Sequence, residues 1–335
     1  MPGPVGDEVV RKQVYVTSKD LTSFIMSLGG VKFWAVAIFP MYVGWVLAQP
    51  AGARRLFVDD LAIVLGLAVI GPLLGTFTLL LNTYYDMGTT DRVNPRKQYV
   101  RVIEDVIDRE TVQYAAWGFG ALGLLLAAFV SANLIPYSGG FLGGSAFLVL
   151  MALSAALSVA YSHPAVRLKG VPGMDLLVNI AGFGVLCPLA GWALLRPVEE
   201  FPVWYLASAA LFVGAAYAPT TASDFESDRA YGIRTLAVAL GPPRTMLLGF
   251  ALLLAAVLLL SAGGMAGWFP FVDDAAGALR PLWAFLVAQV FLYAAFVRRP
   301  TQGKIWALLL LLSVLQFLAT VLFLYFFTGG RAYPP

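Results

Sequence analysis

Cysteine, histidine and charged side chains are all scarce in this 335-residue chain, and each scarcity excludes a class of protein. The single cysteine, Cys187, has no partner for an intramolecular disulfide, and we expect it to be a small apolar packing residue. The single histidine, His163, has no second histidine with which to build a zinc site, so we expect a structural or solvent-facing role. Only 12% of the residues are charged, against roughly 25% in soluble domains, which places the chain among membrane proteins.

Two further features are missing. The chain contains no Walker-type phosphate loop, so a P-loop nucleotide-binding protein is not expected. Residues 1 to 20 mix acidic and basic side chains without the apolar core of a signal peptide, so insertion is expected to depend on the first membrane helix. No nucleic-acid partner is expected, whereas membrane lipids are.

Long apolar runs are abundant, because 60% of the residues are hydrophobic. About 20 apolar residues are enough to cross the hydrocarbon core of a bilayer. By that criterion the sequence predicts nine membrane helices at approximately 28–48, 61–84, 112–132, 141–161, 174–195, 203–223, 245–263, 280–297 and 304–328. The predicted fold is an all-α integral membrane protein with a single domain over 1–335. The first part of this domain, 1–27, is predicted to be an N-terminal segment on the cytoplasmic side.

An acidic cluster follows the predicted sixth helix. Asp224 and Asp228 are four residues apart, so their carboxylates share one face if the helix continues. Two carboxylates at the rim of a bilayer are costly unless a cation lies between them. Mg²⁺ is typically held by one or two carboxylates together with phosphate oxygens of a substrate. Arg229 and Arg234 follow closely and can meet the remaining phosphate charge.

A second polar cluster ends the predicted second helix, where Asn82 and Asp86 are again four residues apart. The alternative for either cluster alone is a solvated loop or a helix cap. Two such clusters, each after an apolar segment and each followed by basic residues, predict a two-metal site for a diphosphate. The 22 Lys and Arg residues divide 17 to 5 between alternate sides, which predicts a cytoplasmic N-terminus with both clusters on that same side.

These motifs resemble those of the UbiA superfamily of membrane prenyltransferases, over essentially the whole chain. Asn82 and Asp86 match the family's Asn-x-x-x-Asp-x-x-x-Asp motif, and Asp224 and Asp228 match its Asp-x-x-x-Asp motif. The loop from Tyr161 to Lys169 is similar to the family's Tyr-Ser-x-Pro-Pro-x-Arg-x-Lys segment. The first motif departs from the pattern, because Thr90 occupies the place of the last aspartate and Asp91 follows it. On a continuous helix Asp91 would not share a face with Asp86, although Gly88 can break the helix.

The resemblance implies nine helices around a central cavity, in which two Mg²⁺ ions bind and ionise an isoprenyl diphosphate and the allylic cation alkylates a lipophilic acceptor. The implied metal ligands are Asn82, Asp86, Asp91, Asp224 and Asp228. The implied diphosphate contacts are Lys32, Arg92, Arg96, Arg167, Lys169 and Arg229, for which the alternative is topology-setting charge. Tyr84, Tyr85 and Tyr161 are candidates to stabilise the cation, with an interfacial belt as their alternative role.

The branch within this superfamily is less closely defined. The runs 94–97, 172–175 and 232–235 look more like carotenoid-modifying members such as lycopene elongases than like members that act on quinone precursors or other aromatic acceptors. A membrane terpene cyclase would share the diphosphate site and need no acceptor. A transporter lined with Asp and Arg is an alternative from another class. Asp175 and Asn179, at the start of the fifth helix, are a further polar pair that faces either the cavity or a partner helix.

Overall fold

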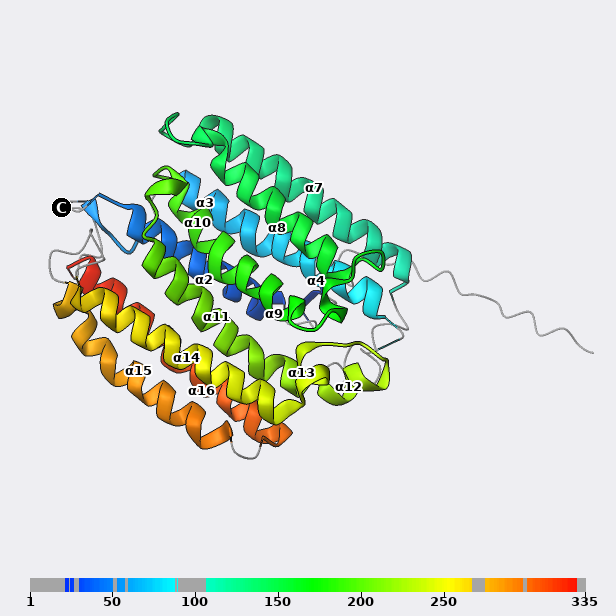
Figure 1. The fold of residues 1–335 in the computed structure, drawn as a ribbon. Coiled ribbons are helices and arrows are strands. Elements are labelled where there is room, and N and C mark those ends of the chain that lie inside the picture. The colour runs from blue at the N-terminus through cyan, green and yellow to red at the C-terminus, as the bar shows by residue number, and fades with distance from the viewer. Residues whose placement is uncertain are drawn as a thin grey trace, which may run out of the picture.

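The computed structural model describes residues 30–50, 53–57, 60–87, 107–266, 275–297 and 300–329, together with residues 22, 23, 25, 26 and 89. Within these ranges the regular structure is entirely helical (Figure 1). The longer helices are α2 (Gly30–Ala48), α3 (Leu61–Ala68), α4 (Leu74–Asp86), α7 (Arg109–Asn133), α8 (Ala146–Ser162), α11 (Val203–Ser223), α14 (Pro242–Met265), α15 (Ala275–Val297) and α16 (Gln302–Phe327). Short helices near one end of the bundle are α9 (Met174–Asn179), α12 (Phe225–Ala230) and α13 (Leu236–Leu240), while α10 (Cys187–Trp192) completes the fifth span.

Eight helical stretches of the described chain are long and apolar enough to cross a membrane. They lie at 30–48, 61–86, 109–133, 143–162, 174–192, 203–223, 242–265 and 303–327, close to eight of the nine predicted segments. The remaining segment corresponds to α15, whose apolar part, Leu282–Val297, is shorter. The protein is therefore an integral, multi-pass membrane protein.

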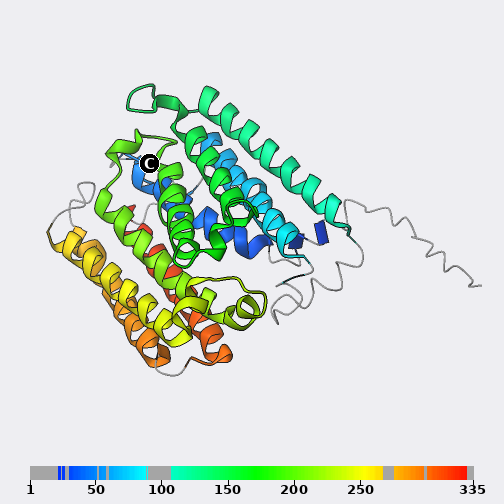
Figure 2. The same cartoon turned by 45° about the vertical axis from the view of Figure 1, so that its right-hand side comes forward.

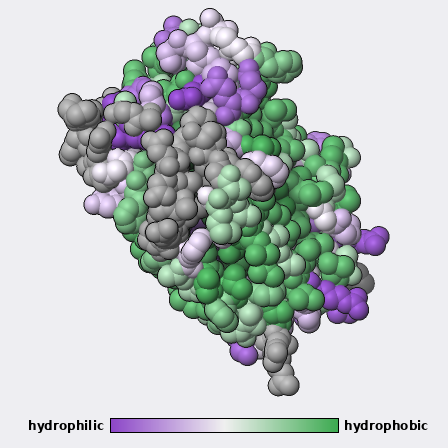
Figure 3. Space-filling model, turned by 60° about the vertical axis from the view of Figure 1, so that its left-hand side comes forward, coloured by the Kyte–Doolittle hydropathy of each residue, from purple (hydrophilic) through white to green (hydrophobic). Residues whose placement is uncertain are grey.

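The surface of the bundle is consistent with a lipid environment. On the face seen in Figure 3, apolar residues cover a broad continuous area and hydrophilic residues gather toward its margins. Large apolar side chains such as Leu125, Phe291 and Leu310 are more than 65% exposed, at 69%, 71% and 66%. Apolar exposure on this scale is unfavourable in water but not in hydrocarbon, because lipid tails are as apolar as leucine.

The helices pack in two groups that meet at the fifth and sixth spans (Figures 1 and 2). One buried cluster joins α2, α3, α4, α7, α8, α10 and the last turns of α16, and the other joins α11, α14, α15 and the rest of α16. The contact between α10 and α2 depends on glycine: a Cβ on Gly191 would lie 1.8 Å from the carbonyl oxygen of Met41, and one on Gly44 would lie 2.0 Å from that of Pro188. Such close backbone approach is common between membrane helices.

Glycines also bring α7 against α4. The run from Gly118 to Gly123 has the spacing GxGxxG, but it lies within a membrane helix and follows no strand. A Cβ on Gly120 would lie 2.9 Å from the ring of Phe77, and one on Gly123 would lie 2.8 Å from Leu74. These glycines therefore serve helix packing and not dinucleotide binding.

Two spans contain a wide, π-helical turn. The second span has one at Val69–Leu73, which includes Pro72, and the fifth has one at Ile180–Leu186, just before Pro188. Proline cannot donate the backbone hydrogen bond of a regular helix, and π-turns are a common way to accommodate the resulting interruption. Each interruption lies partway along a span that carries polar motif residues at one end.

Candidate active site

The first acidic motif lies at the end of α4 and is joined to the loop that follows α8. Lys169, in the short turn Leu168–Gly170, places its Nζ 2.5 Å from Asp86 Oδ1 and 3.1 Å from Asn82 Oδ1. Ser162 Oγ also donates to Asn82 Oδ1, at 3.3 Å. Asp86 and Lys169 are buried, with only 5% and 6% of their surface exposed. Two segments more than 80 residues apart in sequence thus form one polar cluster.

A strained backbone position precedes Lys169. Arg167 adopts a left-handed conformation, with φ of 43°, and is the one non-glycine residue of the described chain with positive φ. This conformation costs roughly 1–2 kcal/mol for an L-residue with a side chain. The turn is supported by a hydrogen bond of 2.7 Å from the amide of Arg167 to the carbonyl of His163. His163, in turn, packs edge-on against Tyr85 at 5.5 Å, which agrees with the structural role predicted for it.

The second acidic motif spans the junction between α11 and α12. The helix is interrupted at Asp224, but the amide of Asp228 still donates to the carbonyl of Asp224 at 2.9 Å, so the four-residue spacing is kept. Thr235 Oγ1 donates to Asp228 Oδ2 at 3.1 Å. The motif is therefore held at its far end by the loop that leads into α13.

The two motifs lie near each other at one end of the bundle, on the right of Figure 1. Burial raises the pKa of the Asp228 carboxyl to about 6, against the hydrogen bond from Thr235, which lowers it. Asp86 and Asp175 raise this pKa further and Lys169 lowers it, so Asp228 lies close enough to all three to respond to their charges.

No group of three or more His, Cys, Asp or Glu side chains converges on a ready-made metal position in the described ranges. Asp86 is instead contacted by the ammonium group of Lys169. The chemistry of the side chains nevertheless fits Mg²⁺, which prefers carboxylate and carbonyl oxygens such as those of Asn82, Asp86 and Asp228. A cation bound beside Asp228 would offset the cost of burying this carboxylate in its ionised form, which is the main cause of its raised pKa.

The tyrosines that the sequence singled out make different contacts. Tyr161 Oη lies 3.3 Å from Tyr217 Oη, and Tyr161 is close enough to Asp86 to respond to its charge. Tyr84 and Tyr85 directly precede Asp86 at the end of α4, and their rings pack on each other at 4.8 Å. The guanidinium of Arg109 lies 4.7 Å from the ring centroid of Tyr84, and Tyr85 also packs on His163.

The basic residues predicted to bind diphosphate also differ in their positions. Lys169 lies within the cluster, whereas Lys32 and Arg229 are exposed and Arg167 is partly buried. The guanidinium of Arg229 lies 5.8 Å from the ring of Phe225 in its own helix. Asp91, Arg92 and Arg96 lie outside the described residues, as do Gly88 and Thr90.

Three residues near the site were not identified from the sequence, namely Tyr217, Thr221 and Thr235. The available signal was in α11, where Tyr217 and Thr221 are four residues apart just before Asp224 in an otherwise apolar helix. Both donate to Asp175, at 3.5 and 3.3 Å, and Asp175 is fully buried. Asp175, one member of the polar pair at the start of the fifth span, thus faces a partner helix, whereas the side-chain amide of Asn179 donates to the carbonyl of Asp175 at 2.8 Å.

Asp228→Asn is expected to raise the melting temperature of the metal-free protein by a few degrees at pH 7.5 and to lose part of this advantage at pH 5. The folded-state pKa of Asp228, about 6, lies above the ordinary value of 3.8, so the destabilisation by Asp228 begins above pH 3.8 and is complete only above pH 6. Protonation relieves that cost as the pH falls, and the neutral amide never bears it. Melting curves of detergent-purified protein with a chelator at both pH values measure the difference.

The matched control for this prediction is Asp108→Asn, for which the sign is opposite. Asp108 caps the start of α7, and the hydrogen bonds from Thr111 hold the pKa of Asp108 below 3.8. Its stabilising effect is present at both pH 5 and pH 7.5, since it is lost only as the pH falls through that lowered pKa. An Asp228→Asn difference that does not change with pH would contradict the assignment of a raised pKa.

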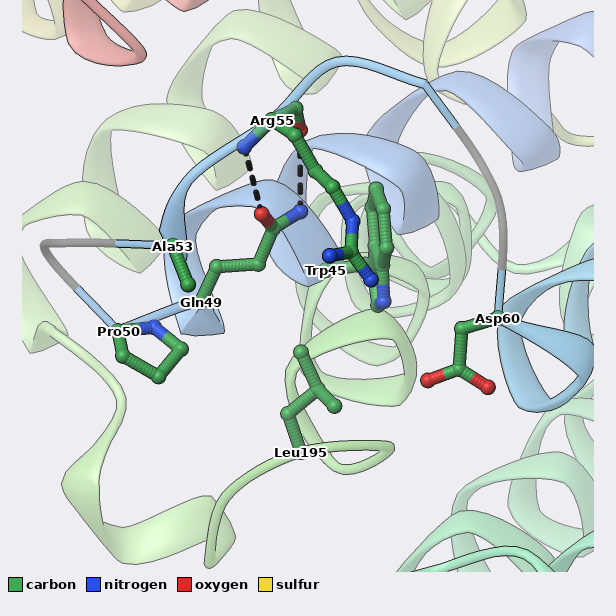
Figure 4. A pocket seen from close by; sticks show the side chains of 7 residues that line it. All are labelled: Trp45, Gln49, Pro50, Ala53, Arg55, Asp60 and Leu195. Atoms are coloured by element: carbon green, nitrogen blue, oxygen red, sulfur yellow. Dashed lines mark hydrogen bonds between the residues drawn. The ribbon is translucent and has the colours of Figure 1, made fainter. Parts of the chain in front are cut away.

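A small pocket of about 100 Å³ lies at the opposite end of the bundle (Figure 4). It is lined by Trp45, Gln49, Pro50, Ala53, Arg55, Asp60 and Leu195. The side-chain amide of Gln49 accepts from the amide of Arg55 at 2.7 Å and donates to its carbonyl at 3.1 Å. Asp60 caps the start of the 26-residue span that ends at Asp86, which corresponds to about 39 Å of helix. The pocket is therefore separate from the acidic cluster.

Comparison with known proteins identifies relatives over most of the chain. The model of the UbiA prenyltransferase family matches residues 37–315. A lycopene elongase/hydratase from Haloarcula japonica is 30% identical over 225 residues, which cover 67% of this chain and 69% of that protein. A lycopene elongase/hydratase from Haloferax volcanii is 28% identical over 233 residues, which cover 68% of each chain.

Solved structures share the fold. A UbiA homologue from Archaeoglobus fulgidus, bound to GPP and Mg²⁺, aligns with a TM-score of 0.64 at 20% identity, covering 90% of this chain and 99% of that one. A structure described as concerning digeranylgeranylglyceryl phosphate synthase in membranes aligns with a TM-score of 0.64 at 15% identity, covering 93% and 99%. At these identities the likeness establishes the helical architecture alone.

Proposed function

Because the chain belongs to the UbiA prenyltransferase family, we propose that it transfers an isoprenyl group from an isoprenyl diphosphate to a lipophilic acceptor of the carotenoid type. The observation that carries this proposal is the meeting of Asp86, Lys169 and Asp228 at one end of the bundle. The lycopene elongase/hydratase relatives support a carotenoid-type acceptor. The homologue bound to GPP and Mg²⁺ supports an isoprenyl diphosphate donor and a magnesium requirement.

The proposed magnesium site contains two ions held by Asn82, Asp86, Asp224 and Asp228, with Asp91 as a further ligand. When bound, Mg²⁺ supplies Lewis-acid stabilisation of the diphosphate oxygens. The burial of the Asp228 carboxyl and the nearby carboxylates of Asp86 and Asp175 support a cation at this place. Lys32, Arg92, Arg96, Arg167, Lys169 and Arg229 are the proposed contacts to the diphosphate.

Lys169 has the most direct role among these cations. As the bond between carbon and the diphosphate oxygen breaks, the electron pair leaves with the diphosphate and negative charge builds there. An ammonium group held in a buried position stabilises that charge without reorganising. Its buried contacts with Asp86 and Asn82 fix the ammonium group at the site before the reaction.

Tyr161 is proposed to stabilise the allylic cation that remains after diphosphate leaves. An aromatic ring attracts a cation through its face, and Tyr161 is near Asp86 at the inner end of α8. The apolar helices around it exclude water that would otherwise capture the cation. The acceptor then forms the new carbon–carbon bond with its own π electrons, and the positive charge passed to the acceptor is removed by loss of a proton or by addition of water.

The proposed topology has nine spans around a central cavity, with α15 as the eighth span. The whole chain, 1–335, forms one domain, and its N-terminal segment, 1–27, lies in the cytoplasm with the mouth of the site. The 17-to-5 division of Lys and Arg supports this orientation. Membrane lipids surround the apolar face.

Release of diphosphate by the purified protein is expected only when both Mg²⁺ and a polyene acceptor are present. Chelation of Mg²⁺ should reduce release to background, because the carboxylates alone repel the diphosphate. The measurement is a coupled pyrophosphate assay combined with mass analysis of the lipid extract, where the acceptor gains one isoprenyl unit. Release without acceptor, with a cyclised product, would instead identify a terpene cyclase. No release under any condition would contradict the proposal and favour a transporter.

A further inference from the structure

Asp175 is a fully buried carboxylate that belongs to neither acidic motif and has no role in the proposed chemistry. It lies in the first turn of α9, at the start of the fifth span. Four groups donate to its side chain: the amide of Gly173 at 3.0 Å, the amide of Leu236 at 3.1 Å, Thr221 Oγ1 at 3.3 Å and Tyr217 Oη at 3.5 Å. A buried carboxylate is costly unless it is hydrogen-bonded, and these donors meet that requirement.

The donors come from three separate parts of the chain. Gly173 belongs to the loop before α9, Tyr217 and Thr221 belong to the last turns of α11, and Leu236 begins α13. Leu236 is 61 residues from Asp175 in sequence. Asp175 therefore fastens the start of the fifth span to two other elements.

Both of these elements adjoin the second acidic motif. Thr221 lies three residues before Asp224, and Leu236 directly follows Thr235, whose hydroxyl donates to Asp228. Asp175 thus holds the chain on both sides of the motif. A shift at either contact would move Asp224 or Asp228.

The same short segment also holds the first motif. Lys169, six residues before Asp175, contacts Asp86 and Asn82. Residues 169–175 therefore contact the first motif at one end and the supports of the second motif at the other. This segment is therefore one physical link between the two motifs.

We propose that Asp175 is a positioning residue that sets the separation of the two acidic motifs, and thereby the affinity of the site for Mg²⁺ and diphosphate. This inference rests on the proposed function. A displacement of about 1 Å in a reacting site costs up to about 10²-fold in rate, so loss of one anchoring charge has a measurable effect. A carboxylate that only stabilised the fold would change the melting temperature and leave the magnesium dependence of the folded protein unaltered.

The experiment compares Asp175→Asn and Thr221→Val with the control Ser208→Ala. Asparagine keeps the size of Asp175, but its N–H₂ group replaces one acceptor oxygen and faces hydrogen-bond donors, with which it cannot pair. Thr221→Val removes one of the four donors to Asp175. Ser208 is also a buried hydroxyl of α11, but it donates only to Trp204 and lies 13 residues, or about 20 Å, before Thr221. The first measurement is the melting temperature of detergent-purified protein during titration with Mg²⁺ and inorganic pyrophosphate. The second is the rate of hydrogen exchange at the Leu236 amide.

The wild type is expected to be stabilised by the titration. Asp175→Asn should need about tenfold more Mg²⁺ for half of the effect and should lose protection of the Leu236 amide. Thr221→Val should show a smaller change in the same direction, and Ser208→Ala should titrate like the wild type. The half-saturating Mg²⁺ concentration for diphosphate release should change in the same order.

Each other outcome has a defined meaning. If the wild type itself does not respond to Mg²⁺ and pyrophosphate, the proposed function fails and this inference fails with it. If the wild type responds and both variants titrate identically to it, Asp175 is not a positioning residue, whatever the change in melting temperature. If Asp175→Asn does not fold, the inference is tested by Thr221→Val alone. A magnesium dependence of the Thr221→Val variant equal to that of the wild type then overturns the inference.

Discussion

Asp224→Asn is expected to leave a folded protein that has lost nearly all turnover, by about 10³-fold or more. Asp224 is a proposed metal ligand, and an amide lacks the negative charge that holds Mg²⁺ against the diphosphate. The fold should survive because the local structure uses the backbone carbonyl of Asp224, which accepts from the amide of Asp228 and from Ser227 Oγ. The measurement is prenyl transfer per folded protein at several Mg²⁺ concentrations.

The matched control is Glu226→Gln, which also removes one negative charge. Glu226 lies two residues after Asp224, in the first turn of α12. Glu226 is exposed and is not a proposed metal ligand, so the activity of the Glu226→Gln variant should stay near that of the wild type. Activity like that of the wild type in Asp224→Asn would remove Asp224 from the metal site. An equal loss in both variants would point to the general charge of α12 instead of a specific ligand.

Lys169→Met is expected to lower kcat by about 10²–10³-fold. Methionine preserves much of the apolar stem but removes the ammonium group that stabilises the departing diphosphate, and the contact with that group strengthens as charge develops. It also leaves Asp86 buried without its partner, which typically costs about 3–5 kcal/mol when a buried pair is broken. The metal-free variant should therefore melt at a lower temperature, and Mg²⁺ should recover part of the loss. Melting curves and single-turnover rates measure both effects.

Arg244→Ala controls for charge that only sets topology. Arg244 is an exposed cation on the side of the membrane where the basic residues are concentrated, and it is not a proposed diphosphate contact. It should change yield or insertion at most, with unchanged turnover of the purified protein. A decrease in kcat of less than about threefold in Lys169→Met would contradict a role for Lys169 in the reaction and would leave it a topology-setting charge like Arg244.

The helical architecture could be predicted because apolar run length alone determines where a chain crosses a bilayer. The sixth segment, for example, was predicted at 203–223 and is observed as Val203–Ser223. The family resemblance could indicate Lys169 as a candidate site residue, because motif residues are read directly from the sequence. The pairing of Lys169 with Asp86 across 83 residues needed the structure.

Some contacts made by tertiary packing had no sequence signal. The amide of Leu236 reaches Asp175 because α13 folds back against the fifth span, and no periodicity in the sequence predicts that return. The argument that set Asp91 apart from Asp86 assumed a continuous helix, but α4 ends at Asp86, and Met87 has an extended ψ of 130°. That argument therefore does not apply, and Asp91 itself stays a prediction outside the described residues.

The wide turns at Val69–Leu73 and Ile180–Leu186 also constrain how this sequence can change in length. A π-turn is equivalent to one extra residue in an α-helix. Removing one residue from Val69–Leu73 would restore regular winding and leave Asn82 and Asp86 in nearly the same orientation relative to the first half of the span, because the wide turn absorbs its extra residue. Removing a residue from an α-helical part of the same span would instead rotate Asn82 and Asp86 by about 100°. Changes of one residue in length are thus tolerable in the connecting loops and at the two wide turns, while elsewhere in a span they would change the rotational phase between its two ends.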